Sequence, residues 1–147
     1  MNTLRTILSL ILLGFITFSC SEEGEEPVPE NEATIQLQKL AKTWEPVAVM
    51  KDDEDVTGRF AGFTITFTGQ KTYTTTPERG DYDVEPFKAS GTWDFRNNNL
   101  NIITRDDGVD MNISVTETRL TLQFQIANPN GRMLGIGAYD FELAPQQ

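Results

Sequence analysis

The feature that most constrains the fold of this chain is a two-residue alternation of apolar and polar side chains downstream of Trp44. Residues 61–68 (AGFTITFT) show it, with aromatic or aliphatic residues at alternate positions and threonines between them. The same alternation recurs over residues 110–116 and 119–126. A period of two is typical of antiparallel β-strands that turn one face to a core and the other to water. The pattern therefore predicts an all-β domain.

Turn-forming residues at regular spacing divide this region into short strands. Gly-Gln at 69–70, three asparagines at 97–99 and Asp-Asp-Gly at 106–108 each separate two alternating segments. Such residues favour tight turns, and Asn and Gly tolerate positive φ. We expect eight strands joined mostly by hairpins, at residues 44–51, 61–68, 71–76, 90–96, 99–104, 109–116, 119–126 and 136–143. The one helical pattern precedes them at residues 33–43 (ATIQLQKLAKT), and Pro46 prevents a longer helix.

The number of strands indicates whether the sheet closes into a barrel. Eight strands of this length favour a closed up-and-down antiparallel barrel with a short N-terminal helix, because the links are nearly all short hairpins. A barrel of eight strands is just filled by its side chains or holds one small ligand. A seven-stranded sandwich is the alternative fold.

The N-terminal segment differs from the rest of the chain. Arg5 is its only charge, and residues 7–18 (ILSLILLGFITF) are mostly apolar. This run is shorter than the roughly 20 residues that span a bilayer, and its position is typical of a secretory signal peptide. The single cysteine, Cys20, follows directly. We predict that residues 1–19 are a lipoprotein signal peptide and that Cys20 carries the lipid; the alternative is an uncleaved anchor or a buried helix.

Residues 17–20 (TFSC) resemble a bacterial lipobox, although Thr17 stands where an aliphatic residue is expected. The following residues 21–32 (SEEGEEPVPENE) contain six glutamates and two prolines. Such a composition is typical of a flexible tether, so we assign residues 20–32 to one. An acidic run after the cysteine also resembles the export signal of surface lipoproteins in Bacteroidetes-type bacteria. We therefore expect an outer-membrane lipoprotein that faces the cell surface; a plain solvated spacer is the alternative.

The composition excludes several kinds of chemistry. The 147 residues include no His and one Cys, with 12 Lys+Arg against 22 Asp+Glu. Without His there is no Ser-His-Asp or Cys-His couple, and one Cys cannot form a cysteine cluster for a metal. An acidic chain also lacks the basic surface of nucleic-acid-binding proteins. Since no nucleophile is paired with a base and no cofactor motif is present, we expect no enzymatic activity, no cofactor and no nucleic-acid partner.

Two irregular stretches are candidate sites of other kinds. Residues 52–55 (DDED) could supply oxygen ligands to Ca²⁺, but their spacing does not match an EF-hand loop. We interpret them as a solvated loop and expect no metal site. Residues 77–89 (PERGDYDVEPFKA) form the longest irregular stretch, which is either a contact surface at the end of the barrel or a mobile connector.

Four segments resemble the lipocalin-like (calycin) domains of Bacteroidetes lipoproteins. Residues 40–44 (LAKTW) are similar to the Leu-x-Gly-x-Trp motif that leads into the first strand, with Lys42 in the place of Gly. Residues 60–67, 91–95 and 139–143 complete a resemblance that covers about residues 33–147. It implies a barrel closed at Trp44 and a small apolar ligand. It also implies an arginine stacked on that tryptophan, for which Arg132 is a candidate.

The apolar strand faces are the candidate ligand site. They would form the barrel interior from Phe63, Ile65, Phe67, Trp93, Phe95, Met111, Ile113, Leu122, Phe124 and Phe141. With about 115 domain residues, a solid core is an equally good interpretation. We therefore hold two main hypotheses: an envelope lipoprotein whose barrel binds a small apolar or amphipathic ligand, or a solid-barrel protein whose loops contact another envelope protein or a polysaccharide. An enzyme that uses two carboxylates as acid and base is a third, less favoured hypothesis, because nothing in the sequence selects such a pair.

Overall fold

The computed structural model describes residues 30–76, 86–97, 99–127 and 136–147. The predicted signal peptide, Cys20 and most of the predicted tether lie outside these residues, as does Arg132. No helix of the described part is long and apolar enough to cross a membrane.

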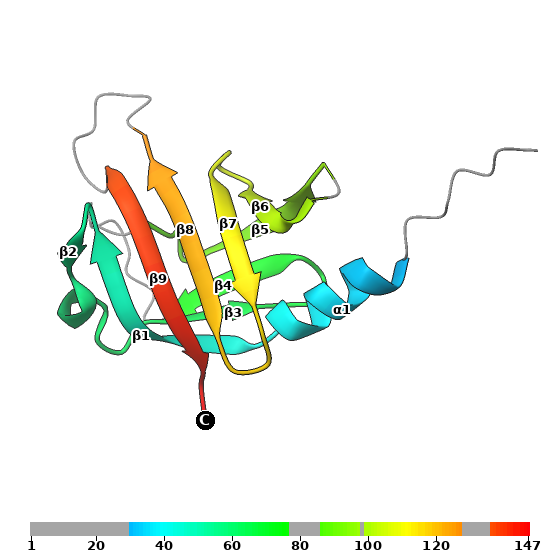
Figure 1. Cartoon of the computed structure of the whole chain (residues 1–147), viewed down its shortest axis with the longest axis horizontal. Helices are drawn as coiled ribbons and strands as arrows, with labels where there is room; N and C mark the ends of the chain where they lie inside the picture. Colours follow the sequence, from blue (N-terminus) through cyan, green and yellow to red (C-terminus); the bar gives the residue numbers. More distant parts are fainter. Residues whose placement is uncertain (1–29, 77–85, 98, 128–135) are drawn as a thin grey trace, which may run out of the picture.

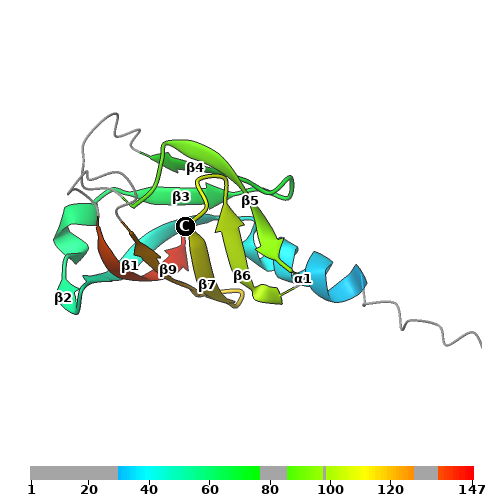
Figure 2. The same ribbon diagram turned by 90° about the horizontal axis from the view of Figure 1, so that it is seen from above.

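The predicted eight-stranded antiparallel barrel is confirmed. Neighbouring strands pair in chain order, and the first strand also pairs with the last, so that the sheet closes on itself. The closed sheet and its short helix are seen from two directions in Figures 1 and 2. The eight strands are β1 (Thr43–Lys51), β3 (Thr64–Phe67), β4 (Thr72–Thr76), β5 (Ser90–Arg96), β6 (Asn99–Arg105), β7 (Asp110–Val115), β8 (Leu120–Ile126) and β9 (Gly137–Pro145).

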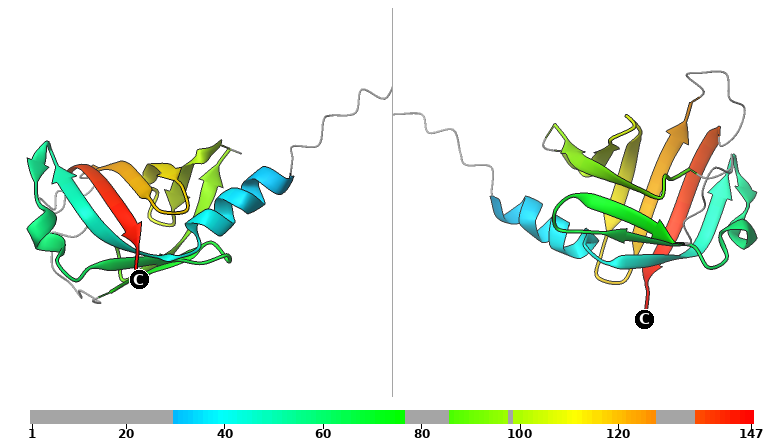
Figure 3. Two further views of the ribbon diagram at one scale, coloured as in Figure 1. Left: turned by 60° about the horizontal axis from the view of Figure 1, so that its bottom comes forward. Right: turned by 180° about the vertical axis from the view of Figure 1, so that it is seen from behind.

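The helix α1 (Glu30–Leu40) begins three residues earlier than the sequence pattern predicts and ends three residues earlier. It ends because the chain turns directly into β1, with the amide of Lys42 donating to the carbonyl of Leu40 at 2.7 Å. Leu40 is fully buried and Leu37 packs against the core, so the last turn closes one end of the barrel. We call this the helix end, and Figure 3 shows the first turns of α1 extending away from it.

Trp44 joins the helix to the closure of the barrel. It is fully buried in β1, where it pairs with Ile65 of β3 and with Pro145 of β9. Its indole nitrogen donates to the carbonyl of Leu40 at 3.0 Å. The ammonium of Lys42 lies 5.8 Å from the centre of the Trp44 ring. Arg132, the candidate for an arginine stacked on this tryptophan, lies outside the described residues.

The opposite, or far, end of the barrel differs from the prediction. The expected strand 61–68 is shorter, because Gly62 adopts a positive φ of 76° and β3 begins only at Thr64. Before it the chain forms a short 3-10 helix, η1 (Thr57–Phe60), whose Phe60 is buried against the core. The acidic run 52–55 forms a tight turn and the two-residue strand β2 (Glu54–Asp55), which pairs with the end of β1.

Candidate functional site

The interior of the barrel at the far end is an aromatic cluster with Phe87 at its centre. The Phe87 ring lies 5.8 Å from that of Phe63, 6.3 Å from Tyr73, 5.4 Å from Phe124 and 5.5 Å from Phe141, measured between ring centres. Tyr73, Phe124 and Phe141 come from β4, β8 and β9, and Phe63 directly precedes β3. Phe87 itself belongs to the segment that precedes β5 and is only 7% exposed. A connecting segment therefore supplies the ring that fills this part of the barrel.

A buried cation lies beside this ring. Arg105, the last residue of β6, is 4% exposed, and its guanidinium lies 5.1 Å from the centre of the Phe87 ring. The Nε atom donates to Asp107 at 3.0 Å, and a second nitrogen forms an ion pair with the same carboxylate. A third contact runs from Arg105 to the backbone carbonyl of Pro86. Arg105 thus holds the segment that carries Phe87 against the barrel wall.

Two titratable groups at this end, Asp107 and Tyr139, have shifted pKa values. Burial raises the pKa of Asp107, but the hydrogen bond and the charge of Arg105 outweigh it, so the pKa lies below the ordinary value of 3.8. Burial raises the pKa of Tyr139, with a further contribution from the charge of Asp52. Both groups are therefore in their usual charge states at neutral pH: Asp107 is ionised and Tyr139 is neutral.

Tyr139 has a buried hydroxyl that makes no hydrogen bond within the described part of the chain. The residue is 3% exposed on β9, and the ammonium of Lys51 lies 5.6 Å from the centre of its ring. Buried polar atoms are nearly always hydrogen-bonded, so an unpaired hydroxyl calls for an explanation. A polar group of a ligand, or a water molecule, would satisfy it.

Nine of the ten residues predicted for the interior are at most 6% exposed and belong to one core cluster. Phe95 is the exception: it is half-buried and lines a groove on the outside of the barrel. The sequence interpretation missed Arg105, Phe87 and Tyr139. Alternation along β6 could have revealed Arg105, because it shares the inward face with Ile103. Phe87 offered no such signal, since no strand period extends through its segment.

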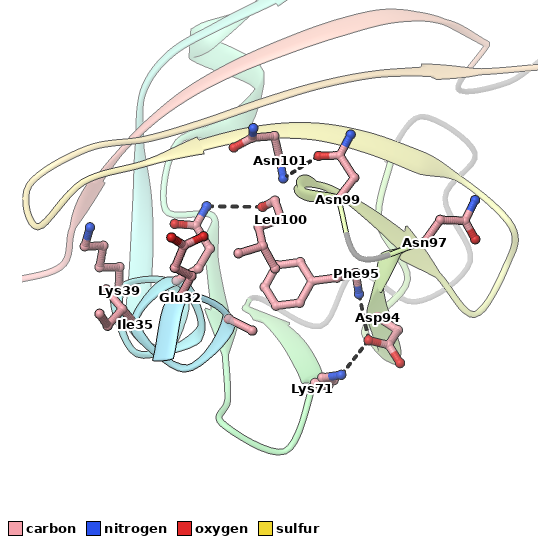
Figure 4. Close-up of a pocket in the computed structure, with 12 residues that line it drawn as sticks. Glu32, Ile35, Lys39, Lys71, Asp94, Phe95, Asn97, Asn99, Leu100 and Asn101 are labelled. Carbon is pink, nitrogen blue, oxygen red and sulfur yellow. Dashed lines mark hydrogen bonds and ion pairs between the residues drawn. The ribbon is translucent and has the colours of Figure 1, made fainter. Parts of the chain in front are cut away.

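The structure also shows two hollows on the outer surface. One, of about 780 Å³, lies between α1 and the β5–β6 hairpin (Figure 4). The other, of about 640 Å³, lies over β7, β8 and β9 and includes four aspartates, Asp52, Asp53, Asp110 and Asp140. Within the described residues no group of acidic side chains is arranged to hold a metal ion.

Comparison with known proteins identifies the family. The family model of the lipocalin-like domain matches residues 40–122, from the end of α1 into β8. No curated protein and no solved structure shows significant similarity to the chain. The family match covers more than half of the chain and agrees with its closed eight-stranded barrel, so the protein belongs to the lipocalin-like domain family.

Proposed function

We propose that the protein is an exported envelope lipoprotein, anchored through Cys20, whose barrel binds a small apolar or amphipathic ligand at the far end. The anchor and the cell-surface location rest on the sequence pattern of residues 1–32. The binding role is supported by the fold, because lipocalin-like barrels typically bind small ligands. Binding is favoured over catalysis because the chain contains no His and no paired nucleophile and base.

The observation that carries this proposal is the position of Phe87. Its ring contacts four aromatic side chains, yet it belongs to a connecting segment and not to a strand. The ring can therefore leave the interior without breaking any pairing between strands. An apolar group of a ligand would then occupy the same aromatic surroundings, and its burial would offset the roughly 1.5–3 kcal/mol that a buried Phe side chain contributes.

The polar groups nearby favour an amphipathic ligand over a purely apolar one. Arg105 supplies a buried cation and Tyr139 a buried hydroxyl without a partner in the described structure. Lys51 adds a second cation beside Tyr139. A ligand with an apolar body and one polar or anionic end would satisfy the hydroxyl while its body replaces the Phe87 ring.

Substitution of Phe87 tests the proposal on the full-length protein. The probe is the apolar fluorophore N-phenyl-1-naphthylamine, whose emission rises when it is buried. Phe87→Ala should bind it at least about tenfold more tightly than the unchanged protein, since no side chain has to be displaced. Phe87→Leu serves as a second variant, because Phe→Ala in a core costs about 3–5 kcal/mol and could unfold the domain. Val47→Ala, on the exposed face of β1, is the control.

Native mass spectrometry of protein purified from its source would identify the ligand. A bound mass lost from an Arg105→Met variant would support the amphipathic ligand. If no mass is bound and neither Phe87 variant binds the probe, the ligand hypothesis is wrong. The close packing of the core favours the alternative in that case: a solid barrel whose loops contact another envelope protein or a polysaccharide.

A further inference from the structure

A second candidate binding site lies outside the barrel, in the groove between α1 and the β5–β6 hairpin. Its volume of about 780 Å³ is within the range of small-molecule sites. In Figure 4 residues of α1 from Glu32 to Lys39 form one wall and the hairpin forms the other. Lys71, from the β3–β4 turn, lies at the lower edge of the groove in this view. The groove shares no residue with the aromatic cluster around Phe87, so its chemistry can be assessed separately.

An irregularity in the sheet shapes the hairpin wall. Phe95 of β5 pairs with Ile103 of β6, but the next residue of β5, Arg96, pairs with Asn99. Residues 100–102 of β6 therefore have no partner in β5. The extra residues of β6 leave the ladder with β5, and the carbonyl of Leu100 accepts a hydrogen bond from Gln36 of α1 at 3.2 Å instead. Such bulges commonly occur next to functional sites, where they redirect side chains. Here the bulge brings β6 to the helix and creates the groove.

The floor of the groove is an aromatic ring. Phe95 is half-buried, and Figure 4 shows its ring in the middle of the groove below Leu100. The ring packs edge-on against Trp93, with 5.3 Å between ring centres, which fixes its orientation. Ile35 of α1 also lines the groove and is 41% exposed. A ligand in the groove therefore meets a fixed apolar surface.

The rim of the groove is rich in amides. Asn99 and Asn101 are exposed on the bulge, and the Asn99 side-chain oxygen accepts from the backbone nitrogen of Asn101 at 2.9 Å. Within the described residues, neither the side-chain amide of Asn101 nor the side-chain nitrogen of Asn99 makes a hydrogen bond. Each amide can donate and accept, so the rim suits a ligand whose groups do both.

The charges around the groove balance. Glu32 and Asp94 oppose Lys39 and Lys71, and Lys71 is paired with Asp94 at 2.5 Å. A groove without net charge in an acidic protein attracts neither an anion nor a cation strongly. The groove therefore favours a neutral ligand.

We propose that this groove binds a neutral carbohydrate chain. The apolar C–H face of a sugar ring packs on the aromatic ring of Phe95. The hydroxyls of the sugar form hydrogen bonds with the side-chain amides of Asn99 and Asn101. Sugar hydroxyls both donate and accept, which matches amides better than it matches the paired charges nearby. The proposal does not depend on a ligand inside the barrel.

The test measures binding of neutral hexasaccharides to the full-length protein by saturation-transfer NMR and calorimetry. The probes are the α-1,4 and β-1,4 glucose, β-1,4 xylose, β-1,4 mannose and β-1,4 N-acetylglucosamine hexamers, with a heparin hexasaccharide and an uncharged hexapeptide for comparison. At least one neutral sugar should bind with millimolar or better affinity. Asn101→Ala and Phe95→Leu should each weaken it about tenfold or more, whereas Asn112→Ala, on the outer face of β7, should not.

Three results would overturn the proposal. No neutral sugar binds at about 10 mM; or a sugar binds but both groove variants bind it as well as the unchanged protein; or the hexapeptide or the heparin fragment binds more tightly than every neutral sugar. Thermal unfolding of each variant shows whether it is folded. Asn101 is exposed, and its side chain takes part in none of the hydrogen bonds or ion pairs among the described residues, so Asn101→Ala keeps the test valid if Phe95→Leu is unstable.

Discussion

Arg105 carries a charged side chain at a buried position, which is unusual for an arginine. It lies on the inward face of β6, in contact with the Phe87 ring and with one carboxylate, Asp107. Burying an ion pair costs desolvation energy, so the pair as a whole contributes little, but removing one partner leaves the other uncompensated. Arg105 is therefore a residue on which both stability and the position of Phe87 depend.

Replacing Arg105 by Met should lower the free energy of unfolding by about 2–4 kcal/mol, because Asp107 loses its partner and the guanidinium contact with Phe87 disappears. The matched control is Arg119→Met. Arg119 pairs with Glu142 at 3.1 Å, but its side chain is 61% exposed, and such surface pairs contribute at most about 1 kcal/mol. Urea unfolding of both variants measures the difference, and equal losses would contradict this account of Arg105.

The stability of the domain should also depend on Asp107 in acid. The folded-state pKa of this carboxyl is lowered, so its pairing with Arg105 stabilises the fold above the ordinary value of 3.8. That contribution is lost as the pH falls through the lowered, folded-state pKa. Asp107→Asn should therefore be less stable than the unchanged protein at neutral pH and less sensitive to pH below about 4. The measurement is the free energy of unfolding of both proteins between neutral pH and about pH 3. If the two proteins lose the same free energy as the pH falls, the prediction is wrong.

Among the secondary-structure elements, the junction of α1 and β1 matters most, since it closes the helix end and positions one wall of the groove. The Trp44 indole bonds the last carbonyl of α1, and Gln36 bonds the bulge of β6. The alternation and turn signals predicted all eight barrel strands to within three residues at each end. Neither η1 nor β2 was predicted, because both depend on the local conformation of a turn and not on a repeating pattern.

Trp44→Phe keeps an aromatic ring but removes the hydrogen bond to Leu40. The loss should be about 1 kcal/mol of unfolding free energy, the net contribution of one hydrogen bond, because the carbonyl of Leu40 still accepts from the amide of Lys42. Amide hydrogen exchange should accelerate in α1 more than in β7 and β8. Trp93→Phe is the control, since its indole nitrogen lies 3.4 Å from the carbonyl of Thr72 and contributes a weaker bond. Uniform acceleration across the barrel would contradict a specific role in the junction.

For the whole molecule, the proposed arrangement is a barrel held at a membrane by lipid on Cys20. Two or three acyl chains, at about 0.8 kcal/mol for each buried CH₂, are enough for a stable anchor. The structure corrects the end of the predicted tether, because its residues 30–32 form the first turn of α1. The rest of the proposed tether precedes α1, so the anchor would be attached at the helix end of the barrel.

Cys20→Ala should release the protein from membranes, because no thiol remains to carry the lipid. Fractionation of cells followed by immunoblotting measures this, with Ser21→Ala as the control. A variant that stays in the membrane fraction with its first 19 residues uncleaved would show that the lipid-anchor prediction is wrong.

By itself the sequence determined the class of fold, the number of barrel strands and which strand faces are apolar. These follow from a period of two and from turn residues, and both are local properties of the chain. Tertiary structure alone decided which residues meet. Phe87 fills the interior because a connecting segment folds inward, and Gln36 reaches Leu100 across 64 residues because the bulge of β6 turns toward α1. Such contacts depend on how the closed sheet is bent and joined, which no local pattern specifies.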